Sequence, residues 1–304
     1  MRALLAVDGS RNSTRAMELV RNLVWPSGTT IRVLAVCHAF PFYGATPGAI
    51  LTPQVVERTE AAFWGEAEAL LCSTVGRLGR PEIEVQGEVS RSAATGAIID
   101  EAERLVADLI VVGSRGMGWF ESSFVGSTSV ALVDHAPCSV LVARGDTIHR
   151  ILFADDGSEL AGRAGEAVRT WPILRRCPVR VISVSDVPRG WQQVLLPFAA
   201  DVQDAYEAAV HRSHKEHMDL AAASVNRLHE AGIEADSAVP QGNPAHHIVE
   251  AAVNWGADLV VLGHRGRTGR LSVGSVAHNV LLHAPCSVLV VRAASQPAEA
   301  RSRR

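Results

Sequence analysis

Two glycine-containing segments have residue types and spacing that suit the binding of a phosphate group. The first segment, GSRGMGWFESSFVGS at residues 113–127, follows the apolar run LIVV. Gly113 and Gly116 are expected to permit positive φ angles and to let an anion approach the backbone N–H groups. Gly126 and Ser127 are expected to start a helix, whose unpaired N–H groups and positive dipole end favour phosphate. The segment is therefore a candidate phosphate-binding loop.

An aspartate near the N-terminus supplies a complementary chemistry. Asp8 directly follows the apolar run LLAV in the segment LLAVDGS, at residues 4–10. A carboxylate does not suit phosphate, but it can accept hydrogen bonds from ribose hydroxyls or from a base amine. Open parallel sheets bind ligands at the carboxyl ends of their strands, where the winding direction reverses. Asp8 and Gly113 both follow predicted strands, so we expect them to face one crevice.

The elements that would position these residues occur twice in the chain. We interpret the sequence as a tandem duplication with a period of about 145 residues, too long for a solenoid repeat. Domains are expected at 1–146 and 147–293, followed by a disordered tail at 294–304. The matching segments are LLAVDGS with LFADDGS (152–158), ADLIVVGSRG (107–116) with ADLVVLGHRG (257–266), and HAPCSVLVAR (135–144) with HAPCSVLVVR (283–292).

Each half alternates short, apolar, β-branched runs with longer amphipathic ones. This alternation is typical of a parallel sheet covered by helices on both faces, so we predict two doubly wound, Rossmann-like α/β domains. Strands are expected in the first half at about 2–7, 30–37, 82–89, 108–112 and 138–143, and helices at about 12–24, 54–77, 93–106 and 127–135. Strands are expected in the second half at about 150–155, 178–185, 233–239, 258–262 and 286–291.

Composition excludes several classes of protein. A net charge of -3 and a pI near 6.5 argue against a nucleic-acid-binding protein. No apolar run approaches the roughly 18 residues of a membrane span. The five cysteines are scattered, and we expect a cytoplasmic protein. Lys215 is the only lysine and lies in a polar helical run, which excludes a Walker-type phosphate loop and a kinase-type strand lysine.

The spacing of Gly113, Gly116, Gly126 and Ser127 resembles the G-x2-G-x9-G-S/T motif of nucleotide-binding universal stress proteins. The resemblance to the tandem form of that family covers nearly all of residues 1–293. It implies five-stranded sheets of order 3-2-1-4-5, with ATP as the ligand, alone or with Mg²⁺. It also implies that two units pair through their fifth strands. Two chains could associate further as a homodimer, because sheet pairing need not cover every apolar patch on the helices.

The resemblance also implies binding positions outside the glycine motif. Asp8 is expected near the adenosine and the backbone around Ala39 along the adenine. Independently of the resemblance, Arg115 is a candidate to pair with phosphate oxygens, because of its charge. Val89 begins VSRSAA, which aligns with the family pattern V-x-x-G-x-P that the second half keeps as VPQGNP. The expected counterparts in the second half are Asp156, Val187, Val239, Gly263, Gly266, Gly274 and Ser275.

The two halves depart from the motif in different places. In the second half only seven residues separate Gly266 from Gly274, against nine in the first. We expect the shorter loop to displace the following helix start and weaken the second site. The second loop carries three arginines that can pair with phosphate oxygens, but we rank convergent backbone donors above charge and place the first site first. These arginines are Arg265, Arg267 and Arg270.

The sequence thus favours an ATP-binding stress-response or regulatory protein that acts on an unknown protein partner. Two alternatives stay open: an interaction module with decayed sites, and a slow ATPase. His211, His214 and His217 are interpreted as a solvated helix face, because a spacing of three turns them around the axis. Asp134 and His135 are not interpreted as a triad with Ser127. Trp119 and Phe120 could cap a nucleotide, grip a partner or anchor the loop.

Overall fold

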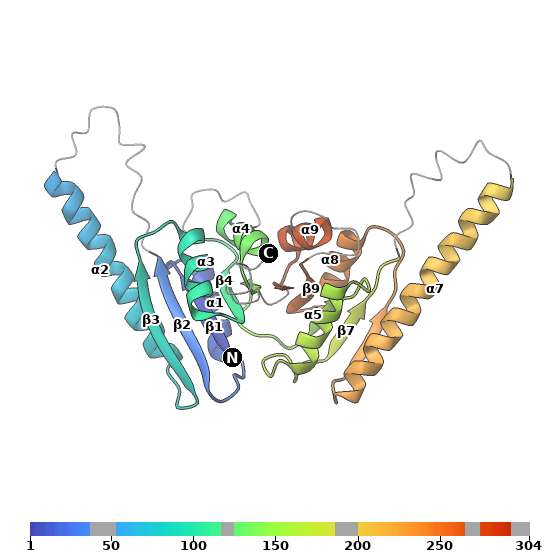
Figure 1. Ribbon diagram of the computed structural model, residues 1–304, viewed down its shortest axis with the longest axis horizontal. Coiled ribbons are helices and arrows are strands. Elements are labelled where there is room, and N and C mark those ends of the chain that lie inside the picture. Colours follow the sequence, from blue (N-terminus) through green and yellow to red (C-terminus); the bar gives the residue numbers. More distant parts are fainter. Residues whose placement is uncertain (37–52, 117–124, 186–199, 265–273, 293–304) are drawn as a thin grey trace, which may run out of the picture. The chain divides into compact units, whose positions relative to one another are not determined.

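The computed structural model describes residues 1–36, 53–116, 125–185, 200–264 and 274–292, in two compact units (Figure 1). The units are Met1–Thr147 and Ile148–Ala293. Several expectations fall on residues outside the described ranges. They concern Ala39, Val187, Gly266, the aromatic pair at 119 and 120, the three arginines of the second loop and the tail at 294–304.

The first unit is a five-stranded parallel sheet between two layers of helices. Its hydrogen-bonded order is β3-β2-β1-β4-β5. Helices α1 and α2 pack on one face, and α3 and α4 on the other. The elements are β1 (Arg2–Val7), α1 (Arg11–Asn22), β2 (Thr29–Val36), α2 (Pro53–Leu78), β3 (Ile83–Ser90), α3 (Ala94–Leu105), β4 (Leu109–Gly113), α4 (Ser127–His135) and β5 (Ser139–Ala143).

The second unit repeats this arrangement. Its strand order is β8-β7-β6-β9-β10, again with parallel pairing throughout. Helices α5 and α7 contact the sheet, and α8 packs against both β6 and α9. The elements are β6 (Ile151–Ala154), α5 (Glu159–Thr170), β7 (Val179–Ile182), α7 (Ala200–Glu230), β8 (Ala235–Ala238), α8 (Pro244–Trp255), β9 (Leu259–Gly263), α9 (Ser275–His283) and β10 (Ser287–Val291).

The sequence D-G-S explains how each first strand turns into its helix. Gly9 and Gly157 have φ angles of 79° and 74°, in the left-handed region that glycine tolerates. The next residue is the N-cap in both units. Ser10 Oγ accepts from the backbone N–H of Ser13, and Ser158 Oγ accepts from that of Ala161. The turn therefore fixes each preceding carboxylate at the carboxyl end of its strand.

The α/β class predicted from the sequence is confirmed, and most element bounds differ from the prediction by one or two residues. The larger differences are in the second unit, where β7 and β8 have four residues each. The side chains of β8 are half-buried or exposed, because it is the outer strand of its sheet. None of the described helices has the length and apolar character that crossing a membrane requires.

Candidate functional site

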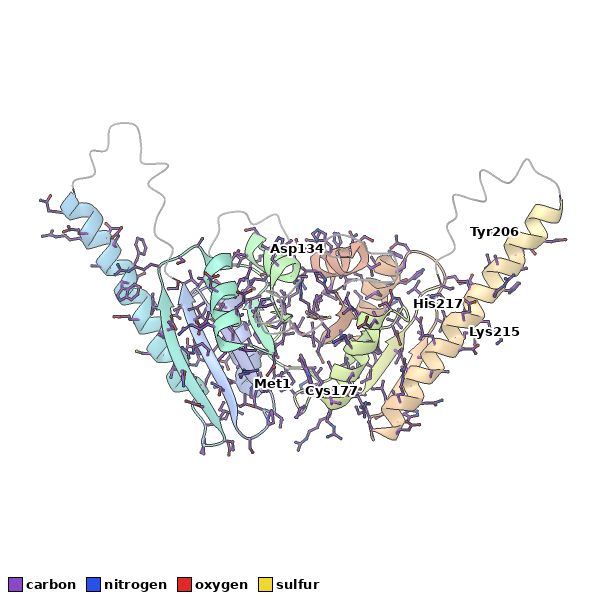
Figure 2. All side chains as sticks on the ribbon, in the orientation of Figure 1. Met1, Asp134, Cys177, Tyr206, Lys215 and His217 are labelled. Atoms are coloured by element: carbon purple, nitrogen blue, oxygen red, sulfur yellow. The ribbon has the colours of Figure 1, made fainter. Side chains whose placement is uncertain are left out.

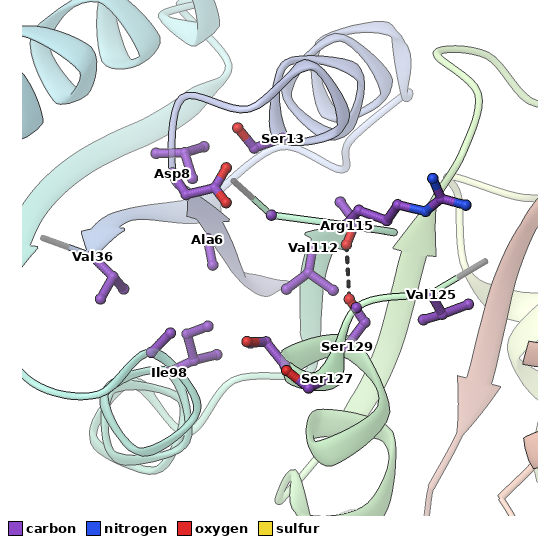
Figure 3. Close-up of a pocket in the computed structure, with 16 residues that line it drawn as sticks. Ala6, Asp8, Ser13, Val36, Ile98, Val112, Arg115, Val125, Ser127 and Ser129 are labelled. Atoms are coloured by element: carbon purple, nitrogen blue, oxygen red, sulfur yellow. Dashed lines mark hydrogen bonds between the residues drawn. The ribbon is translucent and has the colours of Figure 1, made fainter. Parts of the chain in front are cut away.

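A pocket of about 500 Å³ lies at the carboxyl ends of β1 and β4 in the first unit (Figure 3). The structure thus brings together residues that are more than a hundred positions apart in the sequence. Six of the predicted site residues line this pocket: Asp8, Gly113, Arg115, Gly116, Gly126 and Ser127. Val89 is not among the lining residues, because it lies on the outer strand β3, where it pairs with Ala35.

The Asp8 carboxylate is fixed by the turn that follows β1. Its Oδ1 accepts a hydrogen bond of 2.9 Å from the backbone N–H of Ser10. Figure 3 shows the carboxylate on the opposite side of the pocket from Ser127. This placement suits a ligand with hydroxyl or amine donors at one end and an anionic group at the other.

Gly113 and Gly116 are needed for close approach, and neither adopts the positive φ angle that it was expected to permit. Neither has its φ in the left-handed region. A Cβ atom on Gly113 would lie 2.6 Å from the carbonyl carbon of Asn12, so this glycine lets α1 pack against β4. A Cβ atom on Gly116 would lie 2.5 Å from Asp8 Oδ2. Of these two glycines, only Gly116 therefore keeps space open beside the pocket, next to Asp8.

The start of α4 faces the pocket and is held by the strand before it. The backbone N–H of Gly126 donates to the Ser114 carbonyl oxygen at 2.8 Å, and Ser129 Oγ donates to that of Gly113 at 2.9 Å. Among the described residues, no side chain caps this helix through its N-cap residue, Gly126. The first N–H groups of α4 are therefore in place to receive an anion.

One wall of the pocket is apolar, which the sequence analysis did not identify. The side chains of Val36 and Ile98 lie on the same side as Ala6 (Figure 3). Such a wall suits the face of a purine ring. The sequence signal for part of it was Val36, the apolar residue that ends β2, whereas Ile98 lies on α3. The other lining residues are Val7, Ser13, Ala94, Val112, Val125, Thr128 and Ser129.

Arg115 contributes its backbone more clearly than its side chain. The Arg115 carbonyl oxygen accepts a hydrogen bond of 3.2 Å from Ser10 Oγ. Its guanidinium group extends away from the Asp8 carboxylate (Figure 3). The carbonyl contact joins the glycine loop to the turn after β1, so the two predicted motifs are connected directly.

The second unit repeats the backbone of this site. Asp156 Oδ1 accepts from the Ser158 N–H at 3.0 Å, as Asp8 does from Ser10. The Gly274 N–H donates to the His264 carbonyl at 3.0 Å, as Gly126 does to Ser114. The expected displacement of the second helix start is therefore wrong. The residue after β9 holds the start of α9 at Ser275 as the residue after β4 holds the start of α4.

Two further predicted positions of the second unit have counterparts in the first. A Cβ atom on Gly263 would lie 2.8 Å from the Leu160 carbonyl carbon. The absence of a side chain on Gly263 therefore lets α5 pack closely against β9, as Gly113 lets α1 pack against β4. Val239 follows β8, the outer strand, and is half-buried. Val239 is thus at the position that corresponds to Val89.

The clearest difference between the units is a buried carboxylate next to Asp156. Asp155 occupies the position of Val7, which lines the first pocket. It is 4% exposed, and its Oδ2 accepts a hydrogen bond of 2.6 Å from Ser224 Oγ on α7. Arg227 Nη2 in turn donates to Ser224 Oγ at 2.8 Å. A charged hydrogen-bond network thus replaces an apolar wall residue.

The histidines of α7 do not gather into a metal site among the described residues. His217 Nδ1 lies 2.8 Å from the Ser213 carbonyl, and His214 Nδ1 lies 3.5 Å from Ser185 Oγ. Lys215 is exposed and pairs with Asp219 on the same helix (Figure 2). Within the described residues, the one grouping of three metal-ligating side chains is His246, His247 and Glu250, which the sequence analysis missed.

Comparison with known proteins identifies relatives of both halves. The profile of the Universal stress protein family matches residues 1–144 and 147–292. A universal stress protein of Thermus aquaticus is 33% identical over 141 residues, which cover 46% of this chain and 96% of the relative. One from Mycobacterium tuberculosis is 28% identical over 226 residues, which cover 69% of this chain and 70% of the relative.

A solved structure extends the likeness to the whole chain. The crystal structure of a universal stress protein from Archaeoglobus fulgidus superposes with a TM-score of 0.62 and 20% sequence identity. The match covers 96% of this chain and 98% of that one. At this level of identity the likeness concerns the fold.

Proposed function

The chain belongs to the universal stress protein family, and on that premise we propose that its first unit binds ATP and presents a nucleotide-dependent surface to a protein partner. The observation that carries the proposal is the pocket in which Asp8 faces the start of α4 across the glycine loop. Ligand binding that orders such a loop would change which surface a partner meets.

The pocket fits each part of an adenine nucleotide. Its volume of about 500 Å³ lies within the range typical of small-molecule sites. The apolar wall around Val36 and Ile98 would pack against the purine, and Asp8 would accept hydrogen bonds from the ribose. The N–H groups at the start of α4 would bind the phosphates. We assign no protein ligand for Mg²⁺, since the described residues of this pocket hold no cluster of metal-ligating side chains.

Isothermal titration calorimetry of the full chain with ATP tests this proposal. We expect Asp8→Ala to weaken binding about tenfold or more, because one to two hydrogen bonds of about 1 kcal/mol each are lost. Gly116→Val should abolish binding, because its side chain would collide with the Asp8 carboxylate. Asp156→Ala is the matched control in the second unit. A wild-type chain that binds no ATP at millimolar concentration would refute the proposal and leave the interaction module as the function.

We also propose that the first site binds ATP more tightly than the second. Loop length does not distinguish the two sites, because the two helix starts are held alike. The replacement of Val7 by Asp155 supports the ranking instead, since it puts a buried carboxylate, hydrogen-bonded to Ser224, at a position that contributes an apolar lining residue to the pocket of the first unit. If Asp8→Ala leaves the tighter binding intact and Asp156→Ala removes it, the ranking is wrong.

Rapid hydrolysis is not part of the proposed function. Lys215, the only lysine of the chain, lies on α7 and pairs with Asp219. We expect a steady-state rate of ATP hydrolysis well below the range of about 1 to 10³ per second of ordinary enzymes. A rate within that range would show that the chain is an ATPase.

The assembly and location of the chain are further proposals. The family resemblance supports pairing of the two units through β5 and β10, the last strand of each unit's order, and allows a homodimer. Light scattering during size-exclusion chromatography would give the oligomeric state. We propose a cytoplasmic location and domain limits near residues 146 and 293.

A further inference from the structure

Three side chains on the first turns of α8 offer metal-ligating atoms to one point. His247 Nδ1 lies 3.2 Å from Glu250 Oε2, and His246 Nε2 lies 3.9 Å from the same oxygen. One ligand atom from each of the three residues lies within 4.8 Å of the others. Positions three and four apart share one face of a helix, which is why a single turn can present this set.

The hydrogen bond on the far side of the His247 ring selects its tautomer. His247 Nε2 lies 3.0 Å from the Gln241 carbonyl oxygen, which can only accept, so Nε2 carries a proton and donates. In the neutral ring Nδ1 is then an acceptor that faces a carboxylate oxygen at 3.2 Å. Two acceptors at this distance need a cation between them, either a proton or a metal ion. Metal-ligating histidines regularly donate their other N–H to a backbone carbonyl in this way.

The backbone that carries the three residues is held firmly. Gln241 forms a parallel bridge with Ser185, and the Gly242 N–H donates to the Ser185 carbonyl at 3.1 Å. Asn243 caps α8 by accepting from the His246 N–H at 3.0 Å, and Pro244 occupies the start of the helix. The carbonyl that orients His247 and the turn that carries the ligands are therefore positioned together before any ion binds.

We propose that His246, His247 and Glu250 bind a divalent transition-metal ion of the zinc class. Two imidazoles and one carboxylate are a ligand set that Zn²⁺ accepts in proteins, with a fourth position open to water or an added ligand. Tetrahedral coordination with metal–nitrogen distances of about 2.0 Å places the ligand atoms about 3.3 Å apart. The side chains of His246 and Glu250 are 71% and 51% exposed, so closing their separation of 3.9 Å meets little resistance.

The site belongs to the second unit alone. The alignment of VSRSAA with VPQGNP places Gly96, Ala97 and Asp100 at the three corresponding positions of α3. Of these, only the aspartate could ligate a metal. Ala94 and Ile98, on the same part of α3, line the pocket of the first unit. Because α8 is the counterpart of α3, a metal ion on α8 would bind at the end of the second unit that corresponds to the pocket end of the first.

Calorimetric titration of the metal-stripped full chain with Zn²⁺, without nucleotide, tests the proposal independently of ATP binding. We expect one equivalent to bind, and visible absorption of the Co²⁺-substituted chain to indicate a tetrahedral site. His247→Ala and the nearly isosteric Glu250→Gln should each weaken Zn²⁺ binding about tenfold or more. His211→Ala, on α7, is the matched control and should leave it unchanged. Circular dichroism checks that each variant is folded.

Two results would overturn the proposal. The first is a wild-type chain that binds no Zn²⁺ at micromolar concentration, because the pair of His247 and Glu250 is then an imidazolium–carboxylate ion pair bridged by a proton. The second is Zn²⁺ binding that survives in folded His247→Ala and Glu250→Gln but is lost in His211→Ala. That outcome would place the ion on the histidines of α7.

Discussion

Replacing Ser224 with alanine should destabilise the second unit by about 2 kcal/mol, because it removes the donor to a buried carboxylate. Ser224 and Asp155 are each 4% exposed, and their hydrogen bond is 2.6 Å long. Hydrogen bonds to charged groups contribute about 1.5 to 3 kcal/mol. The Gly157 N–H still donates to Asp155 Oδ1 at 3.0 Å, so the carboxylate keeps one partner and the loss stays in the lower part of this range.

The first unit offers a matched control. Leu70 is the side chain that a Cβ atom on Gly9 would meet, as Leu220 is for Gly157, so Thr74, four residues after Leu70, corresponds to Ser224. Thr74 Oγ1 donates at 2.8 Å to the Leu70 carbonyl of its own helix, a neutral acceptor. Thr74→Val keeps the shape of the side chain and should cost about 1 kcal/mol or less.

Hydrogen–deuterium exchange measured by mass spectrometry can follow the two units separately in the full chain. A loss of about 2 kcal/mol should speed exchange about 30-fold in peptides from β6 and α7 of Ser224→Ala. Peptides from β1 and α1 should be unaffected. Adding Asp155→Val should recover much of the loss, because apolar groups then replace both partners, as Val7 does in the first unit. The reasoning is refuted if Ser224→Ala and Thr74→Val change exchange equally.

Three further predictions concern the backbone and the thiols. Val106 is the C-cap of α3 and has a left-handed backbone with φ at 50°, whereas the C-cap of α8 is Gly256, with φ at 66°. Glycine adopts this conformation without strain, so Val106→Gly should raise the free energy of unfolding by about 1 kcal/mol and shift the urea midpoint upward. Gly113→Ala should lower that midpoint sharply even without ligand, since its Cβ atom would overlap the backbone of α1. Burial raises the pKa of the Cys177 thiol, so less of it is the reactive thiolate at a given pH. At pH 8, alkylation followed by peptide mass spectrometry should therefore find exposed Cys72 modified much faster.

The sequence by itself determined the duplication, the α/β class and the place of the site. Alternation of strands and helices is a local pattern, and a D-G-S turn specifies its own left-handed glycine and serine cap. The rule that ligands bind at the carboxyl ends of parallel strands predicts that Asp8 and Gly113 face one pocket, which both residues line. These features depend on neighbouring residues or on topology alone, which is why a linear pattern contains them.

Tertiary structure decided what each residue does within that frame. The sequence showed Gly113 and Gly116 as one motif, but they have different roles. Gly113 leaves room for the backbone of α1, and Gly116 leaves room for the carboxylate of Asp8. The shorter second loop suggested a displaced helix, yet a hydrogen bond from Gly274 to the strand end holds it in place. Asp155 finds its donor 69 residues away on α7. These outcomes depend on atoms brought within about 3 Å by packing between distant segments, and no periodicity along the chain specifies such contacts.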